Sequence, residues 1–380
     1  AAAGAAGAAG AAPRPTPAAW PSRAELLAAV PQECFERDLA TSTGYLAMSA
    51  LLTGVLAAAA HAFIPLSWWA LPAWALYAAA CGTAATGLWV IAHECGHGAF
   101  SESRLVNDGV GFLLHSAMLV PYFAWQRTHA LHHSNTNHME RGQTHVPKVA
   151  GQGSKREGIY RNMEKDKFAW YNAVIHLVLG WPAYLLAGES AGPAYAPTGH
   201  FWPHEPVGAR EIDTFPGQWK HKVLLADAGV AAALCLLAYW ASQAGVMTVF
   251  ALYGGPYLVV NAWLVTITWL QHTHHDLHHF GQRDFTWVKG AFSTVDRDWG
   301  WLLDVLHHRI TTTHVAHHVC ERIPHYHAVR ATEALRKAFP ELCLRDDTPL
   351  LDALLGTARA CVLVEPLPGT ADTYHYPRRR

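Results

Sequence analysis

The stretch LATSTGYLAMSALLTGVLAAAAHAFIPLSWWALPAWALYAAACGTAATGLWVIA, residues 39–92, contains no Asp, Glu, Lys or Arg. A second stretch, residues 228–275, is also free of these four residue types. One bilayer crossing takes roughly 20 residues, so each stretch, with the apolar residues beside it, is long enough for a pair of helices. The sequence therefore predicts four crossings, at about 43–63, 68–91, 222–242 and 246–270.

The Lys and Arg residues predict how these helices are oriented. The turns within the two pairs carry none, whereas residues 93–221 carry eleven and the residues after 270 carry thirteen. Because positive loops stay on the cytosolic side, we expect the N-terminus, the middle segment and the C-terminal region to be cytosolic. Two further apolar stretches, 109–125 and 168–188, contain Pro and His, and we interpret them as interfacial or re-entrant helices.

The composition of the 380 residues agrees with a membrane protein. Charged residues make up 15%, against a usual share of about 25%, and there are 16 Trp. The net charge of −1 gives no electrostatic basis for nucleic-acid binding. Seven scattered Cys without a C-x-x-C pattern predict reduced thiols rather than a disulfide framework.

We expect three segments along the chain. Residues 1–38 begin with a low-complexity Ala/Gly/Pro sequence and form a cytosolic N-terminal segment. Residues 39–366 form the membrane domain, and residues 367–380 form a C-terminal tail.

Histidine is the most unusual component, with 26 residues. Eight of them fall into three clusters at helical spacing, HECGH at 93–97, HALHH at 129–133 and HVAHH at 314–318. Spacings of three and four place imidazoles on one helix face, as a metal site in a helical bundle requires. The eight are His93, His97, His129, His132, His133, His314, His317 and His318.

The first cluster also matches the H-E-x-x-H pattern of zinc proteases. A zinc protease needs about three protein ligands, and eight imidazoles suit two metal ions better. We therefore expect Glu94 to orient an imidazole rather than to act as a protease base. We expect the isolated His61, His115, His176, His200 and His375 to be ordinary polar surface residues.

The clusters resemble, in order and spacing, the three histidine boxes of the membrane-bound acyl-lipid desaturases. Outside the boxes, THVPK, TVDRDWG and IPHYHAVRATEA are similar to the oleate Δ12 (omega-6) branch of plants, algae and fungi. The resemblance implies an all-α integral membrane protein, with four transmembrane helices and a cytosolic helical cap that holds a His-rich di-iron centre. It also implies a ninth ligand just after the fourth crossing. LQHTHH offers His272, His274 and His275, of which we favour His272, while His278 and His279 are expected at the surface.

The function implied by the resemblance is an oxidoreductase that uses O₂ and two non-haem Fe to convert oleoyl chains of a phospholipid into linoleoyl chains. Electrons would come from a separate cytochrome b5 and its NADH reductase. The endoplasmic reticulum is the expected membrane, with a plastid membrane as the alternative, and homo- or hetero-oligomers are compatible with the sequence. Four alternatives stay open: an ω-3 (Δ15) desaturase, a hydroxylase, epoxygenase or acetylenase on the same scaffold, an intramembrane zinc protease, and a His-rich metal transporter.

Overall fold

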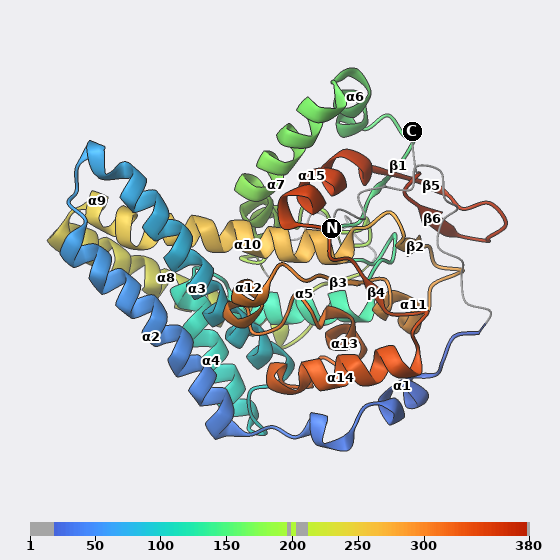
Figure 1. The fold of residues 1–380 in the computed structure, drawn as a ribbon, viewed down its shortest axis with the longest axis horizontal. Coiled ribbons are helices and arrows are strands. Elements are labelled where there is room, and N and C mark those ends of the chain that lie inside the picture. Colours follow the sequence, from blue (N-terminus) through green and yellow to red (C-terminus); the bar gives the residue numbers. More distant parts are fainter. Residues whose placement is uncertain (1–18, 196–198, 203–211, 378–380) are drawn as a thin grey trace, which may run out of the picture.

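A computed structural model describes residues 19–195, 199–202 and 212–377. Figure 1 shows a long arm of helices on one side and a more compact cap on the other. The arm contains α2 (Leu39–Phe63), α8 (Trp219–Ala244), α9 (Val246–Val249) and much of α3 (Leu71–His97) and α10 (Gly255–His272).

The remaining helices belong mostly to the cap. They are α1 (Arg23–Ala29), α4 (Arg104–Ala117), α5 (Tyr122–Ser134), α6 (Lys155–Asn162), α7 (Lys165–Ala187), α11 (Trp287–Ala291), α12 (Trp301–Leu306), α13 (His314–Val319), α14 (His325–Ala338) and α15 (Leu350–Ala360). Short 3₁₀ turns occupy Gln32–Phe35 and Trp68–Ala70, and a π-helical turn, Phe250–Gly254, joins α9 to α10.

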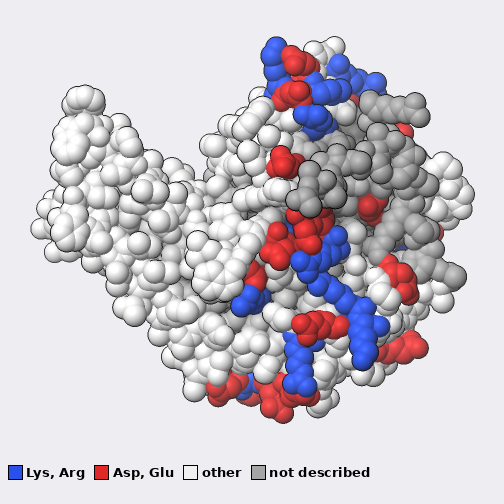
Figure 2. Space-filling model, in the orientation of Figure 1, with Lys and Arg blue, Asp and Glu red and all other residues white. Residues whose placement is uncertain are grey.

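Four helical segments of the described part are long and apolar enough to cross a membrane. They are Leu39–Phe63, Trp68–His97, Trp219–Ala244 and Val246–His272. Each contains one of the predicted crossings, so the all-α fold class with four membrane helices is confirmed. In Figure 2 the Lys, Arg, Asp and Glu residues gather over the cap, and the arm carries none on the visible face.

Helix α3 is central to the fold because it packs against α2, α4 and α10. Gly82 permits the contact with α10, since a Cβ atom there would lie 2.5 Å from Cβ of Val259. The helix ends at Gly98, whose left-handed backbone (φ 71°) forms the C-cap. His93 and His97 are therefore in the last turns of a membrane-length helix.

The apolar stretch 109–125 is not one helix, and our expectation of a single interfacial or re-entrant element is wrong there. It is divided between α4 and α5, with Leu119 at a positive φ of 56°. Pro121 is the N-cap of α5, where its missing N–H costs no intrahelical bond. The stretch 168–188 does form one helix, α7, despite Pro182 inside it.

The cap also contains two small sheets. One has the strand order β1-β5-β6-β2, formed by Lys148–Val149, Leu363–Pro366, Thr373–His375 and His278–Phe280. The other pairs β3 (Val295–Asp296) with β4 (Leu344–Arg345). Residues 373–375, which we expected in a C-terminal tail, thus add a strand to the cap.

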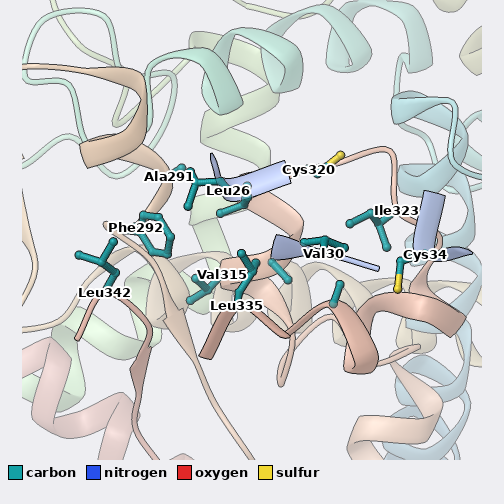
Figure 3. Close-up of a cluster of buried hydrophobic side chains, with 13 residues drawn as sticks. Leu26, Val30, Cys34, Ala291, Phe292, Val315, Cys320, Ile323, Leu335 and Leu342 are labelled. Carbon is teal, nitrogen blue, oxygen red and sulfur yellow. The ribbon is translucent and has the colours of Figure 1, made fainter. Parts of the chain in front are cut away.

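The N-terminal segment is joined to the cap through an apolar cluster. Figure 3 shows Leu26 of α1 and the nearby Val30 beside Val315 of α13 and Leu335 of α14. All four side chains are buried. Residues 23–30 therefore help to fix α13, the short helix that carries the third histidine cluster.

Candidate metal centre

The centre is assembled from the ends of four helices. The C-terminal turns of α3 carry His93 and His97, and the last turns of α5 carry the second cluster. Helix α13 carries the third, and His272 is the last residue of α10. These segments are far apart in the sequence, so their meeting is a tertiary feature.

The nitrogen atoms of eight histidines form two compact groups. His93, His97, His129, His133 and His317 form the first group, and His132, His272 and His318 form the second, with the ligand atoms of each group within 4.8 Å of one another. His314 joins the second group, because its Nε2 lies 3.0 Å from Nε2 of His272. The structure thus brings together all nine residues that the sequence analysis proposed as ligands.

Helix α13 is held so that its imidazoles face inward. Val315, Ala316 and Val319 pack into the apolar cluster of Figure 3. At the start of the helix, the Asp296 carboxylate accepts a 2.9 Å hydrogen bond from the Val315 backbone N–H and pairs with Arg336 at 2.7 Å. One face of α13 is therefore anchored in the cap while the other presents its histidines.

Burial keeps these imidazoles neutral. In the cap, burial lowers the pKa of His132 to about 4, and burial followed by the field of His132 lowers the pKa of His317 to about 3. Burial is also the largest cause of the lowered pKa values of His129, His133, His314 and His318, with neighbouring imidazoles adding to it. A neutral imidazole has the free lone pair that a metal requires.

The donor set fits two metal ions. Nε2 of His317 and Nε2 of His318 are buried and have no hydrogen-bond partner in the described part of the chain. Elsewhere Nε2 atoms face one another, as between His132 and His272 at 3.1 Å. Unpartnered buried nitrogens are costly, and metal ions between the imidazoles would satisfy them.

The surroundings of the imidazoles differ partly from expectation. His318 Nδ1 lies 3.2 Å from the Thr136 hydroxyl, a contact of the kind that fixes the orientation of a ligand imidazole. Nδ1 of His93, His133, His272 and His314 finds no such partner among the described residues. Glu94 contacts His325, a residue outside the nine, whose backbone N–H donates to it over 3.0 Å. In neither compact group of the described chain does a carboxylate take part.

Several histidines expected at the surface are buried. His115 is 0% exposed and packs against Trp89 and Trp125, and His200 bonds the Thr128 hydroxyl at 2.9 Å. His279 is also buried. The expectation was wrong for these three because apolar and aromatic neighbours from other elements cover them. By contrast, His61 is exposed, and His176, His278 and His375 are partly exposed.

A cavity of about 420 Å³ adjoins the centre. Five of the nine histidines line it, together with Trp89, Trp125 and Trp181 and aliphatic residues of α7 and α10. Within it, His145 Nε2 lies 3.1 Å from the Thr268 hydroxyl. The sequence analysis singled out neither residue, although His145 lies within the THVPK motif.

The fold and the site define a class: a helical membrane protein whose buried histidines can hold two metal ions beside an apolar cavity. Comparison with known proteins places the chain within that class. The model of the fatty acid desaturase family matches residues 66–349. The chain belongs to this family.

Three relatives illustrate the similarity. The Δ12-acyl-lipid desaturase of Punica granatum is 39% identical over 348 residues, covering 90% of this chain and 86% of the relative. The Δ12-fatty-acid desaturase of Arabidopsis thaliana is 38% identical over 349 residues, with 90% and 87% covered. The oleoyl-12-hydroxylase of Ricinus communis is 38% identical over 357 residues, with 90% and 86% covered.

Proposed function

We propose that this protein is an O₂-dependent acyl-lipid desaturase that introduces a cis double bond at Δ12 of oleoyl chains. The observation that carries the proposal is the apolar cavity, which is lined by His93, His129 and His132 and also by His272 and His314. A hydrocarbon chain in this cavity lies directly against the metal centre. Relatives named as Δ12 desaturases over 90% of the chain support the position of the double bond.

All nine histidines serve as ligands in this proposal, and the metal is iron. Imidazole alone accommodates several transition metals. The apolar surroundings, and the lack of a carboxylate in the two compact histidine groups of the described chain, favour oxidative chemistry on a hydrocarbon over hydrolysis. When bound, two iron ions supply the activation of O₂. Electrons reach them from a separate cytochrome b5 and its NADH reductase.

The chain's own residues contribute positioning and exclusion of water. Trp89, Trp125 and Trp181 form a buried aromatic wall beside the cluster, so the reacting methylenes sit in a dry, fixed environment. Because the desaturated bond depends on which methylenes lie nearest the metals, the shape of this wall governs the outcome. The protein acts in the endoplasmic reticulum, the membrane named for the similar omega-6 desaturases of Glycine max and Brassica juncea.

A hydroxylase is the second candidate, because the oleoyl-12-hydroxylase of Ricinus communis is 38% identical to this chain. The two reactions share a scaffold and differ in the fate of the attacked carbon. Residues that contact the chain near the metals, rather than the ligands themselves, would decide between them.

Expression in yeast that makes oleate but no polyunsaturates tests the proposal. We expect 18:2 with double bonds at C9 and C12 and no 18:3, and none of this product from the His317→Ala control. Linolenate formed only when linoleate is fed would replace the Δ12 assignment by an ω-3 one. A hydroxylated or epoxidised product would change the reaction but retain the centre, and zinc at one ion per chain would favour the protease alternative.

A further inference from the structure

The cavity beside the metal centre is lined by charged as well as apolar side chains. Besides imidazoles and apolar side chains, two cations line it, Lys148 of β1 and Arg156 of α6. One carboxylate, Glu189, also lines it. Lys148 and Glu189 are exposed, whereas Arg156 is only partly exposed. A cavity that served a hydrocarbon alone would need no guanidinium in its lining, since covering a charge is costly.

Arg156 is held in place but retains unused donors. Its Nη2 donates a 3.2 Å hydrogen bond to Oδ1 of Asn172. The amide of Asn172 is itself buried and oriented, because its Nδ2 donates to the Ala358 carbonyl at 2.9 Å. Nε of Arg156 is buried and has no hydrogen-bond partner in the described chain. Since a guanidinium has five N–H donors, most of them are available to a ligand.

No described carboxylate lies within ion-pair distance of either cation, as the ion pairs of residues 19–195, 199–202 and 212–377 involve neither Lys148 nor Arg156. Burial lowers the pKa of Arg156, while Tyr376 and Glu189 oppose that change. Arg156 is only partly exposed, and a guanidinium covered in this way without a close counter-charge is expensive. An anion bound in the cavity would offset this cost.

The neighbouring helix shows how a lipid could reach the cations. Tyr171, Ile175 and Leu179 of α7 line the cavity, yet they are 43%, 39% and 51% exposed. Trp170, Val174 and Val178, on the same helix, are exposed as well. One wall of the cavity is thus an apolar helix open to the surroundings, and Figure 1 shows α6 and α7 at the edge of the cap.

We propose that Arg156 and Lys148 bind the phosphate of a glycerophospholipid whose acyl chain occupies the cavity. This inference rests on the proposed function only in taking a lipid acyl chain as the substrate. Guanidinium groups match phosphate oxygens in geometry and charge. Two cations and one carboxylate in the lining match a single phosphodiester, whereas a coenzyme A thioester carries several negative charges.

Native mass spectrometry of the full-length detergent-purified protein tests the site without turnover. The protein is offered equimolar dioleoyl phosphatidylcholine and dioleoylglycerol, which share acyl chains and differ in the phosphate. We expect the wild type to retain the phospholipid preferentially, and Arg156→Gln to lower that preference about tenfold or more, as for a lost hydrogen bond to a charged group. Lys155→Gln, which removes an adjacent exposed charge outside the cavity lining, should leave the preference unchanged.

An unchanged preference in Arg156→Gln overturns the proposal. If oleoyl coenzyme A displaces the phospholipid in an Arg156-dependent manner, the anion belongs to a soluble thioester and the phospholipid assignment is wrong. Retained dioleoylglycerol binding shows that a variant is folded. If Arg156→Gln does not fold, Lys148→Gln, at an exposed position, is the deciding variant. Loss of the phospholipid preference in Lys148→Gln supports the proposal, and an unchanged preference overturns it. The absence of linoleate in yeast would contradict the proposed function but would not change the lipid-binding result. The two proposals are therefore tested independently.

Discussion

Individual histidines in this chain differ in role because of what covers them. His317 and His318 each have a buried Nε2 that finds no hydrogen-bond partner among the described residues, which points to a metal. His115 is also buried, but its imidazole packs against Trp89 and Trp125 rather than against the histidines of the three clusters. Burial alone therefore does not identify a ligand; the convergence of several imidazole nitrogens does.

Replacing a proposed ligand should remove metal. His317→Ala, from the larger group, and His318→Ala, from the smaller one, should each lower the bound iron by roughly half or more and abolish desaturation, since metal sites lose affinity steeply with each missing ligand. Iron is measured by plasma emission on purified protein. His61→Ala, at an exposed position on α2, is the control, and wild-type iron in either box variant would exclude that residue from the centre.

His115 makes stability depend on pH. Burial lowers its pKa to about 3, whereas an unfolded histidine titrates near 6.5. Between these values the unfolded chain binds more protons than the folded one, so the contribution to stability is present above pH 6.5 and is lost as the pH falls. The expected slope is about 1.4 kcal/mol per pH unit.

His115→Phe removes this titration and should lower the slope of the unfolding free energy against pH, by a small part of that amount at pH 7 and by nearly all of it at pH 5. Denaturant unfolding at several pH values measures it. The wild-type protein, measured in parallel, is the reference. Equal slopes in the two proteins would mean that His115 takes up protons in the folded state.

At the scale of elements, the contact between α3 and α10 helps to set where the first cluster lies relative to His272, because both helices end at the metal centre. Gly82 lies where the helices come closest, with Cβ and Cγ1 of Val259 at 2.5 Å and 2.8 Å from the position of an added Cβ. A branched side chain at residue 82 would meet the base of the Val259 side chain, which cannot rotate out of the way as the end of a flexible side chain could. The two helices must separate, and the distance between His93 and His272 must then increase.

Gly82→Val should therefore destabilise the protein by about 1–3 kcal/mol, as overpacking usually does, and lower its iron content. Thermal unfolding and metal analysis of the same preparation test both effects. Gly54→Ala, on α2 with nothing within 4 Å of the added Cβ, should be neutral or slightly stabilising because alanine favours helix. A wild-type melting temperature in Gly82→Val would contradict the tight contact.

The whole molecule separates an arm with few charged residues from a charged cap, as Figure 2 shows on one face. This separation agrees with the distribution of Lys and Arg along the sequence. It also explains why all three clusters can meet, because they lie at or beyond the cap ends of the membrane helices.

Epitope tags test the orientation. Tags near Ser67 and near Gln243 should be lumenal, whereas tags at Gly151 and after Arg380 should be cytosolic. Protease protection of sealed microsomes distinguishes the two sides. A lumenal C-terminus would mean that α7 crosses the membrane as a fifth helix, and the clusters could not then meet on one side.

Local patterns predicted much of this protein. Residues 39–92 lack charge, and water-free bilayer interiors accept such helices, so the crossings were predictable. The spacings of three or four residues within the histidine clusters predicted that the imidazoles of each cluster share one helix face. Helix geometry alone places those side chains together. His272 was chosen through a resemblance, and its position at the end of α10 agrees with that choice.

Contacts between distant residues were decided by the tertiary structure alone. The burial of His115, His200 and His279, the partnership of Glu94 with His325, and the division of 109–125 into α4 and α5 depend on neighbours that no local spacing encodes. The cavity belongs to the same category, since Arg156, Thr268 and Trp89 approach it from three separate helices. The sequence by itself determined which segments enter the membrane and which side chains can bind metal, because both follow from local composition and period. Only packing decided which of those side chains meet and what lies beside them.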